Sequence, residues 1–142
     1  PEVHPEASNP ESDLGYLKLK LDLGGEFAIT QLFFDNAHYF DFVARARGRG
    51  ITKPIIPGIL PVVSLKVIQR IVSLCGASLP AGFMVELEEA DRSGGAAAVQ
   101  RAGIAHARRQ AEGLLAGGAP GVHLYTLNRA EAILEIADGL VS

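Results

Sequence analysis

Three short apolar runs mark the chain, at residues 27–35, 54–61 and 121–128. Each run has the length and the β-branched or aromatic content of a strand. The first and third runs are apolar on both faces, which is typical of parallel strands covered by helices. A helical pattern follows each run, so the order of elements predicts three strand–helix units and an α/β fold.

The helices after these runs have recognisable ends and apolar faces. Candidate capping residues mark the start of each helix: Asp35 or Asn36 for the first, Ser64 for the second, and Asn128 with Glu131, three residues apart as a capping-box variant, for the third. Glycines end the first two helices: Gly48, Gly50 and Gly76. Residues three or four apart form the faces: Phe40, Val43, Ala44 and Arg47; Leu65, Ile68, Val72 and Cys75; Ile133, Ile136, Ala137 and Leu140.

A longer stretch, residues 77–119, separates the second and third units. Its alanine-rich part, residues 96–116, has high helix propensity, so one or two extra helices are expected here. We expect its arginines to be solvated and His106 to be a surface or hydrogen-bonded histidine.

The segment "LKLKLDLGGEF" fits two patterns. Leucines alternate with charges before a Gly-Gly pair, which favours a strand entering a hairpin. Leu14, Leu17 and Leu21 also fit helical spacing, and Asn9 or Ser12 can cap a helix start. A strand–helix repeat needs a helix here, so we predict a helix.

Composition narrows the class of protein. The 142 residues are 48% hydrophobic and 20% charged, with a net charge of -3, which predicts one globular domain. No basic run marks a nucleic-acid or membrane partner, and no apolar stretch has the length of a membrane span or of a signal peptide. Cys75, the single cysteine, is expected to be a small buried hydrophobe, and the protein is expected to be cytoplasmic.

Polar residues gather where the predicted strands end. They are His4 at the end of "PEVH", Gln31 and Asp35 in the second half of the first run, and Thr126, Asn128 and Arg129 at the end of the third. Chemistry lies at these ends in a (βα)8 TIM-type barrel, and the GxGxxG signature of a dinucleotide-binding sheet is absent. Three units and the end of another are about half of a ~250-residue barrel, so the chain alone is not expected to close one.

Four motifs carry a resemblance to a known family. "PEVHPEA", "AITQLFFD", "PIIPGILPV" and "HLYTLNRAE", in this order, resemble the second half of the catalytic domain of 5,10-methylenetetrahydrofolate reductases. The resemblance implies that residues 1–142 are the C-terminal half of one (βα)8 barrel: the end of strand 5, strands 6 to 8 with their helices, and extra helices before strand 8. It also implies FAD, which passes hydride from NADH or NADPH to methylenetetrahydrofolate and yields 5-methyltetrahydrofolate for methionine synthesis.

The same resemblance implies roles for individual residues. FAD contacts are expected from His4, Glu6, Ala7, Asp13 and Lys20. Gln31 matches a glutamine that hydrogen-bonds the folate pterin, and Arg129 matches an arginine on the substrate side. Imidazole and ammonium groups can donate to an anionic dinucleotide, and an amide offers a heterocycle edge both a donor and an acceptor. The general acid is expected in the absent N-terminal half, so no catalytic residue is assigned here.

Other readings stay open. Some bacterial relatives have glutamine and phenylalanine at the positions of Val67 and Ile71, which changes the expected folate contacts. We expect a homo-oligomer, and we expect the 142 residues alone to be inactive. One alternative is a non-catalytic half-barrel that pairs with itself or with the missing half. Another is a metal-dependent hydrolase using His4, His123, Glu2 and Glu6, although no HxH or HExxH spacing occurs.

Overall fold

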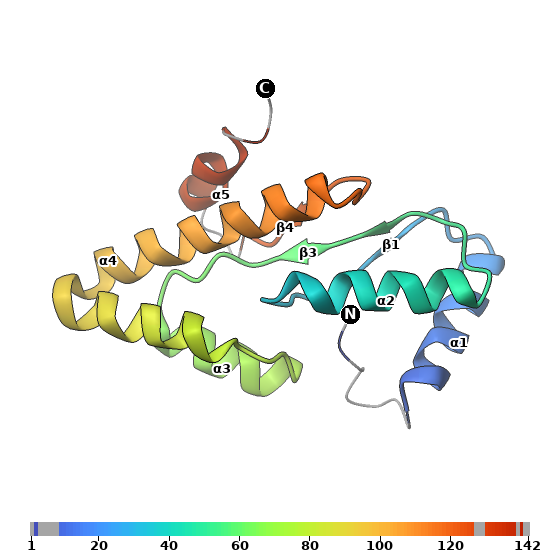
Figure 1. Cartoon of the computed structure of the whole chain (residues 1–142), viewed down its shortest axis with the longest axis horizontal. Helices are drawn as coiled ribbons and strands as arrows, with labels where there is room; N and C mark the ends of the chain where they lie inside the picture. Colours follow the sequence, from blue (N-terminus) through green and yellow to red (C-terminus); the bar gives the residue numbers. More distant parts are fainter. Residues whose placement is uncertain (1, 3–8, 127–129, 139, 141–142) are drawn as a thin grey trace.

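The computed structural model describes residues 2, 9–126, 130–138 and 140. The elements of these residues follow one another as α1 (Pro10–Asp22), β1 (Ala28–Ile29), α2 (Asn36–Gly48), β2 (Ile55–Ile56), β3 (Gly58–Ile59), α3 (Leu65–Cys75), α4 (Ala81–Ala116), β4 (His123–Leu124) and α5 (Ala130–Ala137). Figure 1 shows α1 at one end of the long axis and the bend of α4 at the other. Within the described residues, no helix combines the length and apolar character needed to cross a membrane.

The strands form parallel pairs around one central segment. β1 pairs with β2, with Ala28 opposite Ile55, and β3 pairs with β4, with Gly58 opposite His123. Pro57 separates β2 from β3, and proline has no N–H to contribute to a ladder. The three predicted strands are therefore confirmed in order, and their parallel direction is confirmed. Their ladders are two residues long, much shorter than the apolar runs, so the chain is a mostly helical α/β protein.

The segment "LKLKLDLGGEF", which fits both a strand and a helix by sequence, begins as the last part of helix α1. Asn9 caps α1 by accepting from the Ser12 backbone N–H at 2.8 Å, and the Ser12 side chain faces the Asn9 N–H to complete a capping box. Leu14 and Leu21 are buried on one face, whereas Leu19 and Leu23 are exposed. The helical spacing thus determines burial, and the alternation of leucine with charge does not.

Capping residues also set the ends of the next two helices. Asp35 caps α2 through a 2.9 Å bond from the Ala37 N–H, and Gly76 ends α3 in the left-handed region with φ of 65°. The predicted apolar face of α2 was wrong in detail. Tyr39 and Ala46 are its buried residues, while Phe40 is 36% exposed, because the strands lie on the Tyr39 side of the helix.

α4 contains the predicted extra helices. Two helical stretches meet at Gly95, whose φ of 59° and ψ of -153° are non-helical and favour glycine. Figure 1 shows the chain reversing direction there. The first stretch packs beside α3, and the second runs back along the strands to α5.

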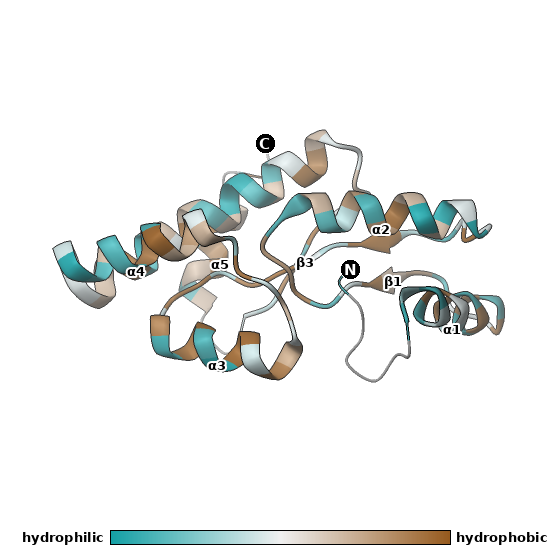
Figure 2. Cartoon of the chain, turned by 60° about the horizontal axis from the view of Figure 1, so that its bottom comes forward, coloured by the Kyte–Doolittle hydropathy of each residue, from teal (hydrophilic) through white to brown (hydrophobic). Residues whose placement is uncertain are grey.

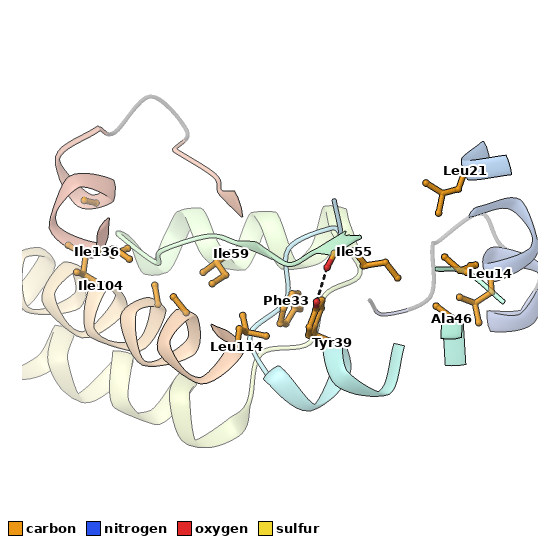
Figure 3. Close-up of a cluster of buried hydrophobic side chains, with 14 residues drawn as sticks. Leu14, Leu21, Phe33, Tyr39, Ala46, Ile55, Ile59, Ile104, Leu114 and Ile136 are labelled. Carbon is orange, nitrogen blue, oxygen red and sulfur yellow. Dashed lines mark hydrogen bonds between the residues drawn. The ribbon is translucent and has the colours of Figure 1, made fainter. Parts of the chain in front are cut away.

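The core has two hydrophobic clusters. The larger cluster draws on α1, α2, the strands, the second stretch of α4 and α5; its members labelled in Figure 3 are Leu14, Leu21, Phe33, Tyr39, Ala46, Ile55, Ile59, Ile104, Leu114 and Ile136. The smaller cluster joins the segments after the strands to α3 and α4, and half-buried Cys75 packs against it. Figure 2 shows the apolar residues concentrated along β1 and β3, with polar residues along the outer surfaces of the helices.

Candidate functional site at the carboxyl ends of the strands

Thr30 ties the three strand segments together just beyond β1. Its N–H donates to the Ile56 carbonyl at 2.9 Å, and its hydroxyl accepts from the Gly58 N–H at 3.0 Å. Its own carbonyl accepts from the Tyr125 hydroxyl at 3.0 Å. Burial raises the pKa of Tyr125, so this hydroxyl remains a donor at neutral pH. The carboxyl ends of the strands are thereby fixed to one another.

Gly58 makes this close approach possible. A Cβ on Gly58 would lie 2.6 Å from the Thr30 carbonyl oxygen and 2.7 Å from the Tyr125 ring. Both contacts are shorter than a carbon atom tolerates. The glycine in "PGIL" is therefore required by the packing between neighbouring strand ends.

Gln31 is the exposed residue of a buried loop. Thr30, Leu32, Phe33 and Phe34 are at most 8% exposed, whereas Gln31 is exposed. Its Oε1 accepts from the Leu32 N–H at 3.1 Å. Among the described residues, none accepts a hydrogen bond from its amide NH2, so this donor is available to a ligand.

Two side chains of α4 hold the loop that follows Gln31. The Gln110 amide donates to the Phe33 carbonyl at 2.9 Å, and His106 Nε2 lies 3.1 Å from the Phe34 carbonyl oxygen. Since a carbonyl only accepts, the neutral imidazole donates through Nε2–H. The His106 ring also stacks on Phe83, with centroids 3.6 Å apart.

The environment of His106 keeps it neutral. Burial lowers its pKa from the ordinary 6.5, and the nearby Arg109 guanidinium lowers it further. The bond to the Phe34 carbonyl and the carboxylates of Glu86 and Asp35 oppose this change. Sequence reasoning correctly expected a surface or hydrogen-bonded histidine but did not predict its partner. The spacing of His106 and Gln110, one helical turn apart, was the available signal.

Asp13 and Lys20 share one face of α1. They are seven residues apart, which places them on the same side of the helix and about 10 Å apart along its axis. Leu14 and Leu21, each one position further on, are buried and hold that neighbouring face against the core. Lys20 is exposed and forms no ion pair with any described residue, so its ammonium group is available to an anion.

Other predicted site residues lie outside the described residues: His4, Glu6, Ala7 and Arg129. Val67 on α3 is 41% exposed, and Ile71 packs against the smaller core cluster. The structure therefore places Gln31 beyond β1 and Asp13 with Lys20 on α1, and leaves the remaining contacts as predictions. In the part of the chain that is described, no three metal-binding side chains lie close enough to form a site.

Comparison with known proteins decides the family. A family model described as methylenetetrahydrofolate reductase matches residues 1–141. The chain belongs to the methylenetetrahydrofolate reductase family. The match covers nearly the whole chain, including the strand ends, Gln31 and α1.

Named relatives span animals, plants and bacteria. The chain is 41% identical over 138 residues to a probable methylenetetrahydrofolate reductase (NADPH) of Caenorhabditis elegans, covering 96% of this chain and 20% of that protein. It is 38% identical over 145 residues to a probable methylenetetrahydrofolate reductase (NADH) of Oryza sativa subsp. japonica, covering 96% and 24%. It is 39% identical over 131 residues to the 5,10-methylenetetrahydrofolate reductase of Salmonella typhimurium, covering 92% and 44%. The chain thus spans less than half the length of these relatives.

Proposed function

We propose that this chain forms the second half of the catalytic barrel of an FAD-dependent reductase. That enzyme would reduce 5,10-methylenetetrahydrofolate to 5-methyltetrahydrofolate with NADH or NADPH. The observation that carries the proposal is the exposed Gln31 amide, fixed at the carboxyl end of a parallel strand in a chain of this family.

The arrangement of strands and helices supports a barrel. Parallel strands joined by helices on one face curve into a barrel, whereas a doubly wound sheet has helices on both faces. The strand residues that join the larger core cluster are Ala28, Ile55, Ile59 and Leu124. Ile29, on the opposite face of β1, is 43% exposed. The exposure of Ile29 on this opposite face of β1 suits the interior of a barrel completed by further strands.

The described residues of α1 fit part of an FAD site. A dinucleotide presents an anionic pyrophosphate and ribose hydroxyls, which suit an ammonium donor and a carboxylate acceptor respectively. Exposed Lys20 would hold the pyrophosphate, and Asp13 on the same face would face the ribose. His4, Glu6 and Ala7 would complete this site. FAD, when bound, supplies the hydride-transfer chemistry, and the protein orients it and excludes water.

Gln31 would orient the folate. Its amide can donate to one atom of the pterin edge while its oxygen accepts from another or keeps its bond to Leu32. Fixing the pterin against the flavin gives the alignment that hydride transfer requires. Arg129 would engage the substrate from the last strand–helix unit, and the general acid would come from the preceding half of the barrel.

A second candidate is a non-catalytic half-barrel that pairs with itself or with the missing half. The exposed apolar residues Leu23 (79%), Phe27 (52%) and Ile29 (43%) lie at and before β1, whose second edge is paired with no described strand and would favour association. Light scattering of the 142-residue chain tests self-pairing directly. A monomer at high protein concentration would argue against it. On the main proposal, this chain alone has no reductase activity.

The proposal is tested on the full-length protein that contains this chain. Purified protein should carry FAD, oxidise NADH or NADPH with menadione as acceptor, and form 5-methyltetrahydrofolate from methylenetetrahydrofolate. Comparing the two nucleotides also establishes the electron donor. Flavin-free protein that binds no added FAD and shows neither turnover would refute the proposal.

A further inference from the structure

We infer that His106 and Gln110 of α4 are positioning residues that fix Gln31 for substrate through the backbone of residues 32–34. This inference rests on the proposed folate contact of Gln31. Neither side chain needs to touch folate, because both act on the loop that carries the glutamine.

Backbone restraints surround Gln31 on both sides. Before it, the Thr30 carbonyl accepts from Tyr125 at 3.0 Å. After it, the Phe33 carbonyl accepts from Gln110 at 2.9 Å and the Phe34 carbonyl from His106 at 3.1 Å. The β1 ladder ends at Ile29. In the loop around Gln31, the side chains of Tyr125, Gln110 and His106 therefore donate the hydrogen bonds that a neighbouring strand would otherwise supply.

The two α4 donors are themselves fixed. The His106 ring stacks on Phe83 from the first stretch of α4, so one side chain couples both stretches of the helix to the loop. Gln110 is 5% exposed, and its backbone carbonyl accepts from the Asn36 amide at 3.0 Å. Preorganised donors of this kind hold a ligand-binding side chain in place without direct contact.

Close packing leaves little freedom for the helix to shift. A Cβ on Gly103 would lie 1.7 Å from the Val62 carbonyl oxygen, and one on Gly113 would lie 2.9 Å from Asn36 Nδ2. The two glycines flank His106 and Gln110 along α4 and let the helix approach the segments after β1 and β3. A shift in the α4 donors would therefore pass to the loop of Gln31.

The test is a double-mutant cycle in the full-length enzyme. His106→Phe keeps a ring beside Phe83 but removes the donor, whereas His106→Gln restores an N–H near the position of Nε2. We expect H106F to raise the KM for methylenetetrahydrofolate about tenfold and to leave menadione reduction by NAD(P)H unchanged. H106Q should return the KM to within about threefold of wild type. In a Gln31→Ala background, H106F should have no further effect on the KM.

Gln110→Met supplies an independent variant. It removes the donor to Phe33 together with Gln110 Oε1, a buried atom that has no partner among the described residues, so folding is disturbed less than by a charged substitution. It should reproduce the increase in folate KM. Equal effects of H106F with and without Q31A, or an equal loss of menadione reduction, would overturn the positioning role. An unchanged folate KM in Q31A alone would instead overturn the proposed folate contact, and the positioning role with it.

Discussion

The hydroxyl of Tyr39 on α2 donates a 2.7 Å hydrogen bond to the backbone carbonyl of Ile55 in β2. The carbonyls of Pro54 and Ile56 accept hydrogen bonds from backbone N–H groups at β1. The carbonyls of Pro57 and Ile59 accept hydrogen bonds from backbone N–H groups at β4. The Ile55 carbonyl points to the same side as those of Pro57 and Ile59, but no β4 residue pairs with Ile55. The Tyr39 hydroxyl therefore takes the place of a strand partner. Figure 3 shows this bond beside the Phe33 ring, which stacks on Tyr39 with centroids 6.1 Å apart.

Removing that hydroxyl should destabilise the protein. Tyr39→Phe leaves a buried carbonyl without its donor, so we expect the free energy of unfolding to fall by about 1–2 kcal/mol. Tyr16→Phe on α1 is the matched control, because Tyr16 is 65% exposed, and should change stability by less than about 0.5 kcal/mol. Urea denaturation of the full-length protein measures both, and equal stabilities for the two variants would contradict the buried bond.

Gly103 tests the packing of α4 against the segment after β3. With 1.7 Å between a built Cβ and the Val62 carbonyl oxygen, Gly103→Ala should lower the free energy of unfolding by at least about 2 kcal/mol. Gly15→Ala is the control, since among the described residues no atom outside the adjacent residues and the local helix backbone lies within 4 Å of its Cβ position in α1. There alanine should stabilise by up to about 1 kcal/mol through helix propensity. If Gly103→Ala were also stabilising, α4 would not approach Val62 as closely as described.

The environment of His106 predicts a pH dependence of stability. Its pKa in the folded protein lies below the ordinary 6.5 because of burial and Arg109. Below that ordinary value the unfolded chain binds the proton more readily, so the His106 contribution is present above pH 6.5 and is lost as pH falls through the folded pKa. The stability difference between wild type and His106→Phe should therefore shrink as the pH falls from about 7 to below 6.5. A difference that stays constant or grows on acidification would contradict a neutral, buried imidazole.

Local sequence signals predicted the helices better than the contacts between them. The candidate caps Asn9 and Ser12 and the spacing of Leu14 and Leu21, taken together with the strand–helix repeat, predicted α1, and the structure confirms it. Pro57 was visible in the sequence, but its division of the predicted strand into β2 and β3 depends on pairing with two neighbours. The partners of His106 and Gln110 lie 72 and 77 residues away along the chain. A single sequence shows the helical spacing of such residues and leaves their distant partners undetermined.

Lys20 on α1 is predicted to contribute to FAD affinity. Lys20→Gln removes the ammonium donor to the pyrophosphate, so we expect the dissociation constant of FAD to rise about tenfold at low salt. Lys18→Gln is the control on the same helix, because Lys18 is paired with Asp22 at 2.6 Å, and should leave the affinity unchanged. Flavin fluorescence during titration of the apoprotein measures both constants. Equal affinities in the two variants would exclude Lys20 from the FAD site.

The most direct test of the account is the effect of Gln31→Glu on the two half-reactions of the full-length enzyme. Glutamate can still accept from the Leu32 N–H as glutamine does, but it loses the amide donor proposed to bind the pterin. Gln69→Glu on the exposed surface of α3 controls for the added charge. We predict that kcat/KM for methylenetetrahydrofolate falls at least about tenfold in Gln31→Glu, while NAD(P)H–menadione turnover stays at the wild-type rate. Unchanged folate kcat/KM, or equal losses in both half-reactions, would contradict a folate site at the carboxyl end of β1.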